Sequence, residues 1–494
     1  MAAMWSPRQL EVVVILVLQL VLLLVLGLCT TYQTGEATEH VTPDAEMAKY
    51  YPLFQDVHVM MFAGFGFLMT FLRRYGYSSV GFNFLLAALL LQWSILCKGF
   101  YDKDPRDGSI HIGIINLLQA DLTVATILIS MGAVLGKVTP LQLVVMGFIE
   151  TAICTANEHL GVSVLKAVDA GGSMYVHVFG AYFGLAASLV LGHGRALRKN
   201  SAELEGASYN SDLFAMVATI FLWCFWPSFN GALSSGDEQV RAVVNTYLAL
   251  AASAVTTFAV SALSTRDAKF SMVHVQNATL AGGVAVGSGC DMLLRPAGAV
   301  AVGVVAGIIS TLAYRYLQPW LLRRVGLHDT CGVHCLHGLP GVLAGIAAAI
   351  AAGLASEQSY GPALYKIFPA RALQPHEGPD GSPSALLGRS AQAQAGFQLL
   401  ALAHSLAIAL VAGALTGVLL RLPVLQQVPR EEWFSDGRHW ELPEEGWESP
   451  SRAANGDCAA TDVVAPSREQ GLDNLALEAG DKVEVTALES QLHI

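Results

Sequence analysis

Twelve apolar runs, separated by short polar connections, dominate the hydropathy pattern of this chain. A bilayer core of about 30 Å needs about 20 consecutive apolar residues in a helix, and most of the runs are close to that length. The pattern therefore predicts an all-α polytopic membrane protein with about twelve transmembrane helices. The runs lie at about 10–31, 57–72, 79–97, 111–136, 139–160, 171–192, 212–236, 242–264, 272–291, 296–320, 333–355 and 395–420.

Two long polar segments stand apart from this pattern. Residues 356–394 are rich in Gly, Pro, Ser and Gln, and they predict a long extracellular loop. Residues 422–494 are punctuated by proline and contain 5 basic and 15 acidic side chains, which predicts a largely disordered cytoplasmic tail. The chain therefore divides into a transmembrane domain, 1–421, and a tail, 422–494. Lys and Arg are more frequent in the connections on the side of the N-terminus, so we expect both termini in the cytoplasm.

Composition supports a membrane protein and removes other classes. Hydrophobic residues make up 53% of the 494 residues and charged residues 14%, whereas an average soluble domain has roughly 25% charged residues. Most of the net charge of −11 belongs to the polar tail, so it does not indicate what the membrane domain transports. The sequence has no basic block suited to nucleic acid, and its eight cysteines form no paired framework.

Two segments far apart in the chain share one arrangement of polar residues. Asp169 is followed by a glycine at the third position and by His177 at the eighth, and Asp329 is followed in the same way by a glycine and by His337. Each segment begins an apolar run, and the two runs are five apart and opposite in direction. Two five-helix halves of inverted topology place corresponding elements in this way. The sequence therefore predicts a five-plus-five inverted repeat.

The shared spacing has a physical meaning. An Asp at the start of a helix caps free backbone amides, and eight residues, about 12 Å of helix rise, carry each histidine toward the midplane. Ionisable side chains inside membrane spans are costly and mark functional sites. A single histidine is more simply explained as a hydrogen-bonded core residue, but two at matched positions favour a function. We expect the imidazoles of His177 and His337 to meet at the centre of the molecule.

These motifs resemble those of the ammonium transporter, methylammonium permease and Rhesus family, and specifically a Rhesus-type ammonia channel. Residues 169–184 are similar to the first twin-histidine motif of the family, and residues 329–341 are similar to the second. The pair Val333-His334 and the stretch around Trp440 look most like the type B non-erythroid branch. The likeness runs from about residue 50 to 440, with further matches at 54–58, 80–85, 212–216, 226–230 and 272–277.

The resemblance implies a homotrimer in which each subunit has one narrow hydrophobic pore. By the family's motifs, His177 and His337 are the pore pair, Asp169 is the buried carboxylate that stabilises the site, and Phe229 is the inner aromatic gate. Leu122 stands where the family usually has a second gating phenylalanine, so we expect the outer constriction to be looser or gated differently. The implied vestibule carboxylates, which attract a cation, are Glu158, Asp212 and Asp121.

Elementary electrostatics connects such a pore to its substrate. At pH 7 most ammonia is protonated to the ammonium cation. Moving an ion into a medium of low dielectric constant costs tens of kcal/mol by idealised estimates. An apolar pore therefore passes neutral ammonia after the cation loses its proton at the vestibule, and it excludes Na⁺ and K⁺. Paired imidazoles offer this guest both donor and acceptor nitrogens. The sequence predicts ammonia/ammonium transport across the plasma membrane, without a cofactor or metal.

Other functions stay open at this stage. A proton-coupled or electrogenic ammonium transporter would use Asp121, Asp169 and Asp329 as a proton relay. A non-conducting structural protein would act through a cytoskeletal adaptor on the tail. Permeation of CO₂ and methylamine, and a basolateral location, are also open. Zinc at the Cys- and His-rich segment 331–337 is disfavoured because the spacing lacks a standard ligand frame, and no enzyme motif is present.

Overall fold

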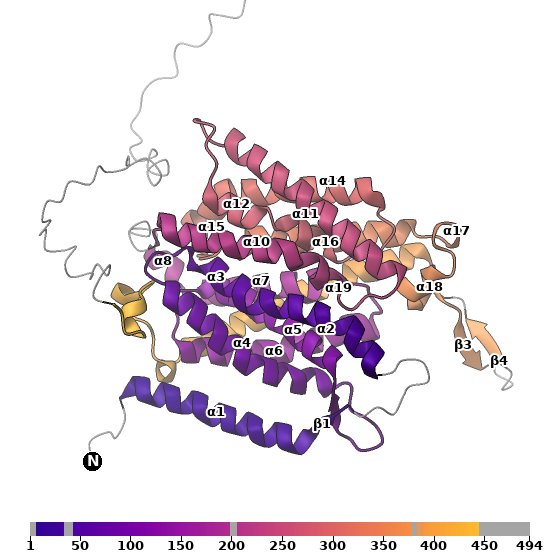
Figure 1. Cartoon of the computed structure of the whole chain (residues 1–494), viewed down its shortest axis with the longest axis horizontal. Helices are drawn as coiled ribbons and strands as arrows, with labels where there is room; N and C mark the ends of the chain where they lie inside the picture. The colour runs from indigo at the N-terminus through magenta and orange to yellow at the C-terminus, as the bar shows by residue number, and fades with distance from the viewer. Residues whose placement is uncertain (1–5, 34–42, 198–204, 378–382, 387, 444–494) are drawn as a thin grey trace, which may run out of the picture. The chain divides into compact units, whose positions relative to one another are not determined.

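The computed structural model describes residues 6–33, 43–197, 205–377, 383–386 and 388–443. Within these residues, eleven helices are long and apolar enough to cross a membrane, so the predicted all-α polytopic fold is confirmed. The first half of the chain contains, in order, α1 (Pro7–Cys29), β1 (Thr30–Tyr32), α2 (Pro43–Val59), η1 (Met60–Gly64), α3 (Phe65–Leu68), η2 (Met69–Phe71), α4 (Gly76–Gly99), β2 (Ile110–Ile112), α5 (Ile114–Val134), α6 (Pro140–His159), η3 (Leu160–Val164), η4 (Ser173–Val178), α7 (Phe179–Leu191) and α8 (His193–Leu197) (Figure 1).

The second half repeats the helical character of the first. Its elements are α10 (Tyr209–Gly231), α11 (Asp237–Leu263), α12 (Met272–Ala278), α13 (Ala281–Gly287), α14 (Arg295–Leu312), η5 (Ala313–Leu317), α15 (Gln318–Arg324), η6 (His334–Gly338), α16 (Leu339–Leu354), α17 (Glu357–Tyr360), α18 (Ala363–Ile367), η7 (Pro369–Arg371), β3 (Gln374–Glu377), β4 (Pro383–Leu386), α19 (Ala391–Leu420), η8 (Pro423–Leu425), η9 (Arg430–Glu432) and η10 (Asp436–Arg438).

The ninth predicted span is not one continuous helix. The run at 272–291 forms two helices of seven residues each, α12 and α13, with a break at Thr279 and Leu280. Glycines let α13 approach its neighbours closely: a Cβ on Gly282 would lie 2.2 Å from the carbonyl oxygen of Ala249 in α11. The segment is apolar enough to count as a span in the sequence, but its two pieces are each shorter than a membrane-crossing helix.

The two segments that share a sequence pattern, 169–177 and 329–337, have the same local structure. In each, a glycine in the left-handed region (Gly172 at φ +67° and Gly332 at φ +73°) precedes a short π-helical stretch, which leads directly into a membrane helix. The π-helical stretches are η4 before α7 and η6 before α16, and they contact one another. The two segments that share a sequence pattern therefore share a backbone conformation as well.

Close packing of small residues holds the centre of the bundle together. Helix α7 contacts both α5 and α19, and α19 also contacts α16 (Figure 1). A Cβ on Gly184 would lie 2.7 Å from Cα of Ser130, and one on Gly413 would lie 2.2 Å from the carbonyl oxygen of Phe183. Small residues let membrane helices approach at the level of the backbone. This packing fixes the helices that carry the two histidines.

The compact helical unit extends to Trp440, past the boundary at residue 421 that the sequence predicts. Phe434 is fully buried, and its backbone N–H donates to the carbonyl oxygen of Gly136 at 2.9 Å. The Asp436 carboxylate accepts hydrogen bonds from the amides of Tyr77 and Ser78, at 3.0 and 2.7 Å, in the first turn of α4. The rest of the predicted tail, from residue 444, lies outside the described residues.

The predicted loop at 356–394 contains regular structure. Its described residues include two short helices, α17 and α18, and an antiparallel pair of strands, β3 and β4, in which Gln374 pairs with Leu386. The Arg389 guanidinium donates to the carbonyl oxygen of Leu165 at 2.6 Å, and Lys366 contacts Glu238 of α11. These bonds attach the loop to the ends of the membrane helices.

Candidate functional site

His177 and His337 meet inside the helical bundle, as the sequence predicts. The Nδ1 atoms of His177 and His337 are 3.1 Å apart, and the rings lie nearly parallel, with their centroids 5.1 Å apart. The two residues are 1% and 4% exposed. One Nδ1 must carry a hydrogen and the other must accept it, so the pair shares a single proton between these atoms. Nε2 of His177 is buried and has no hydrogen-bond partner in the described part of the chain.

A carboxylate at the start of each π-helical stretch positions these rings. Oδ2 of Asp169 accepts from the amides of Met174 and Tyr175, both at 2.9 Å. Asp329 accepts from three amides, those of residues 332 and 333 through Oδ1 and that of His334 through Oδ2. Both carboxylates are thus capping groups, as the position of each Asp at the start of its segment predicts.

Asp169 lies in the connection between η3 and η4, outside the membrane-spanning helices. Burial raises the pKa of this carboxyl to about 6, and the hydrogen bond from the Ser288 hydroxyl, at 2.5 Å, opposes the rise. The group is therefore ionised at neutral pH and becomes protonated in mild acid. A carboxyl with such a pKa accepts and releases protons in the physiological range.

Aromatic rings stack on both sides of the histidine pair. The ring of His177 packs against Phe229 and Trp226, with centroid separations of 5.6 and 5.7 Å. The ring of His337 packs against Phe65 on the other side, at 6.2 Å. The sequence predicts no pore role for Phe65, or for Trp226 within the matched stretch 226–230, because a single aromatic in an apolar run gives no sign of which way it faces.

A cavity lies on each side of this stack of rings. The larger, about 490 Å³, is lined by Phe229 and Leu122 together with Glu158 and Asp169, and we call it the vestibule. The smaller, about 30 Å³, is lined by His337 and Phe65 with apolar side chains of α3, η2 and α5. Both predicted gate residues, Phe229 and Leu122, therefore lie on the vestibule side of the histidines.

Only one of the three predicted vestibule carboxylates lines the vestibule. Glu158 does, whereas Asp121 is fully buried and both its oxygens lie 3.0 Å from Nδ1 of His58. Asp212 begins α10, at the end opposite Phe229, and accepts from Nε2 of Gln276 at 3.2 Å. Asp121 and Asp212 therefore do not line this cavity, because the motif gives the helix but not the face or end on which the carboxylate lies; their role in attracting a cation stays a prediction.

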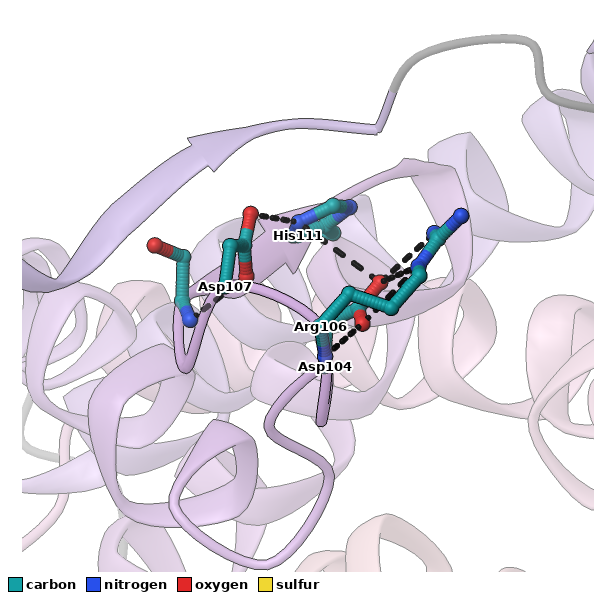
Figure 2. A network of polar contacts seen from close by, with 5 residues as sticks. Asp104, Arg106, Asp107 and His111 are labelled. Carbon is teal, nitrogen blue, oxygen red and sulfur yellow. Dashed lines mark hydrogen bonds and ion pairs between the residues drawn. The ribbon is translucent and has the colours of Figure 1, made fainter.

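A separate polar cluster closes the connection between α4 and α5 (Figure 2). The carboxylates of Asp104 and Asp107 and a ring nitrogen of His111 have ligand atoms within 4.8 Å of one another. Arg106 already donates to Asp104 through Nε at 3.1 Å and through a terminal nitrogen at 2.7 Å, and His111 bonds Asp107 at 2.9 Å. The Arg106 hydrogen bond lowers the pKa of Asp104 to about 2. The cluster is explained as an ion-paired turn at the protein surface.

Comparison with known proteins gives consistent results. A model of the ammonium transporter family matches residues 12–436. A Mus musculus protein named ammonium transporter Rh type B is 50% identical over 407 residues, which cover 82% of this chain and 86% of that protein. The Danio rerio protein of the same name is 46% identical over 440 residues, covering 87% and 92% of the two chains. The solved structure of Rh50 from Nitrosomonas europaea is 30% identical, with a TM-score of 0.66 over 83% of this chain and 96% of that chain.

Proposed function

Because this chain belongs to the ammonium transporter family, in its Rh branch, and is a multi-pass membrane transporter of ammonia or ammonium, we propose that neutral ammonia is the species that crosses. The observation that carries the proposal is the buried His177–His337 pair between two cavities. An unpaired ion in this apolar setting would pay a large desolvation cost. A neutral molecule that both donates and accepts hydrogen bonds pays far less.

The chemistry divides between the vestibule and the histidine pair. Ammonium enters the vestibule, where the ionised Asp169 stabilises the cation and Phe229 and Leu122 separate it from the pore. The cation gives up its proton to the Asp169 carboxylate, which releases it to water on the same side, and ammonia passes the ring of Phe229. Nε2 of His177 has no hydrogen-bond partner among the described residues and can hydrogen-bond the ammonia molecule. On the far side, ammonia takes up a proton from water and becomes ammonium again.

The shared proton of the histidine pair suits this task. The Nδ1 atoms satisfy each other, so each ring directs its other nitrogen away from the pair. Protonation of both rings would place two like charges side by side in a region of low dielectric, which is unfavourable. A single added proton would leave one uncompensated charge in the same apolar region, which is also unfavourable, and a neutral pair neither repels nor traps ammonia.

The wider arrangement follows the family and the charge pattern. We propose that the chain forms a homotrimer in the plasma membrane, with a pore in each subunit and both termini in the cytoplasm. On this arrangement the vestibule and the loop attached to it face outward. We assign the chain no catalytic activity, because moving ammonia requires only the transfer of a proton at each end of the pore.

The test is an ammonia-driven pH change in proteoliposomes that contain the purified protein. The double variant His177→Ala/His337→Ala should lose most of the protein-dependent alkalinisation, by about tenfold or more, because both imidazole partners of ammonia are removed from the pore. His404→Ala, which removes a histidine of α19 outside the pore, should leave the rate unchanged. Equal rates in the wild type and the double variant would refute the pore role of the pair.

A further inference from the structure

A lysine inside the vestibule is paired with Glu158, the predicted vestibule carboxylate that lines this cavity. Nζ of Lys98, in the last turn of α4, lies 2.9 and 2.8 Å from the two carboxylate oxygens of Glu158, near the end of α6. Both side chains line the vestibule, and they are 13% and 33% exposed. The distances are those of charge-assisted hydrogen bonds. The Glu158 carboxylate is therefore engaged through both of its oxygens.

The side chain of Lys98 imitates the substrate. Its terminal group is an ammonium ion that carries one organic substituent, and it takes the position at Glu158 that free ammonium would take. Because it is tethered, its effective concentration at the carboxylate is far above that of a dissolved ion. Ammonium from solution must displace this tethered competitor before it can bind Glu158.

A second carboxylate of the vestibule is engaged in the same way. Oε2 of Glu238 lies 2.5 Å from Nζ of Lys366, and Oε1 lies 3.4 Å from Arg241. Two of the acidic side chains that line the vestibule are thus paired with cations of the chain. The carboxylate of Asp169, by contrast, is held by backbone amides and a serine hydroxyl. Asp169 therefore remains as a carboxylate next to the pore that no lysine or arginine of the described chain neutralises.

We propose that Lys98 determines the substrate affinity of this transporter by occupying the cation site of Glu158, so that Asp169 and Asp291 are the acidic side chains of the vestibule lining that no lysine or arginine of the described chain pairs with. The proposal rests on the function proposed above and refines it. With Lys98 in place, the vestibule does not accumulate cations, and the transporter saturates only at high ammonium concentration. Removal of the lysine charge uncovers a site for ammonium and for other monovalent cations.

The ion pair also has a purely structural explanation, which the test must separate. A lysine in the last turn of a helix interacts favourably with the helix dipole, and the Lys98–Glu158 bond joins α4 to α6. A structural role predicts a loss of stability or of maximal flux on substitution. The proposed role predicts a change in half-saturation and in cation inhibition, with the maximal flux unchanged.

The experiment measures initial alkalinisation rates of proteoliposomes against ammonium concentration, for wild type and Lys98→Met. Salts are equal on both sides, and because the vestibule lies at one end of the pore, only protein whose vestibule faces outward responds to the substitution. At an ionic strength of about 0.01 M, where screening is weak, the half-saturating concentration should fall about three- to tenfold in the variant, a size consistent with one partly exposed ion pair. At about 0.15 M the difference should shrink. Guanidinium, which binds carboxylates well, should inhibit the variant but not the wild type.

Three further variants complete the design. Lys98→Arg keeps the charge and should behave as the wild type does. Glu158→Gln in the presence of Lys98 should raise the half-saturating concentration, and the double variant Lys98→Met/Glu158→Gln should return it toward the wild-type value. Lys103→Met removes a positive charge from the exposed connection after α4, where Lys103 lies over the ring of Phe100, and should change nothing.

The outcomes distinguish the two proposals. If wild-type flux depends on His177 and His337 but Lys98→Met has the wild-type half-saturation and no guanidinium inhibition, the role of Lys98 is refuted while the pore stands. If Lys98→Met does not fold, an unchanged half-saturation in Glu158→Gln refutes the role. If wild-type flux does not depend on the two histidines, the pore proposal itself fails.

Discussion

At the scale of single residues, Asp169 combines two tasks that respond differently to substitution. It caps η4, and its carboxylate faces the vestibule. Asn keeps an oxygen that can accept the same amide bonds but cannot ionise. We therefore expect Asp169→Asn to fold and to reduce flux by about tenfold or more, because the proton acceptor is lost. Initial rates in proteoliposomes measure this, and a wild-type rate in the variant would contradict it.

The raised pKa of Asp169 predicts a pH dependence of both flux and stability. Because burial favours the protonated form, the folded state binds this proton up to a pH of about 6, whereas the unfolded state loses it near 3.8. Stability therefore falls as the pH rises from about 4 to about 6 and is level above that, by on the order of 3 kcal/mol in all. Flux per unit of ammonia should rise over the range around pH 6. Thermal unfolding and flux measured against pH should both lose this step in Asp169→Asn.

The sequence predicted some of these residues and not others for a clear reason. The spacing within each of the two similar segments predicts the two histidines and the capping carboxylates. This spacing can be read directly from the sequence. Asp121 and Lys98 depend on partners from other helices, since their contacts are to His58 and Glu158. Pairing of this kind between distant segments is not visible in a single sequence.

At the scale of elements, the left-handed glycine before η6 sets the direction of the pore helix. Gly332 has φ +73°, and a Cβ there would lie 2.1 Å from the ring of Tyr314. Gly332→Ala should therefore destabilise the protein by about 3 kcal/mol or more, since it combines backbone strain with a steric clash. Thermal unfolding in detergent measures the effect.

A matched glycine separates the two causes. Gly361 also has a positive φ, +56°, but a Cβ there would have nothing within 4 Å. Gly361→Ala should cost only the backbone strain, about 1 to 2 kcal/mol. Equal losses of unfolding free energy in the two variants would show that the steric contact with Tyr314 does not contribute to the destabilisation.

The elements that the sequence missed share one property. Hydrophobic periodicity identifies a long helix by its repeat, but a π-helical stretch of five or six residues, as in η4 and η6, is too short to alter that repeat. The break between α12 and α13 is hidden in the same way, because both pieces are apolar throughout. Tertiary contacts, here glycine packing against α11, decide these details.

At the scale of the whole molecule, the segment that follows α19 completes the helical unit. Phe434 is fully buried, and its ring lies near Gly136 at the end of α5. Phe434→Ala should lower the free energy of unfolding by about 3 to 5 kcal/mol. Truncation after residue 443 should leave the thermal unfolding temperature unchanged, because the compact unit ends at Trp440. An equal effect of both changes would contradict this boundary.

Composition placed the domain boundary too early because polar residues outnumber the buried ones in this segment. Between residues 430 and 440 the chain alternates charged side chains with Trp433, Phe434 and Trp440. The buried ring of Phe434 and the capping carboxylate of Asp436 are single residues in a polar stretch. By contrast, eleven of the twelve predicted spans form membrane-length helices in the described residues, since each is a long apolar run, and the ninth is broken.

The account depends on the claim that ammonia crosses the membrane without charge. The most direct measurement is the initial rate of alkalinisation of proteoliposomes at one ammonium gradient, under imposed membrane potentials of either sign. A neutral guest predicts the same protein-dependent rate at every potential, with no net current. A rate that rises at one sign and falls at the other would show that ammonium itself crosses, and it would contradict the account.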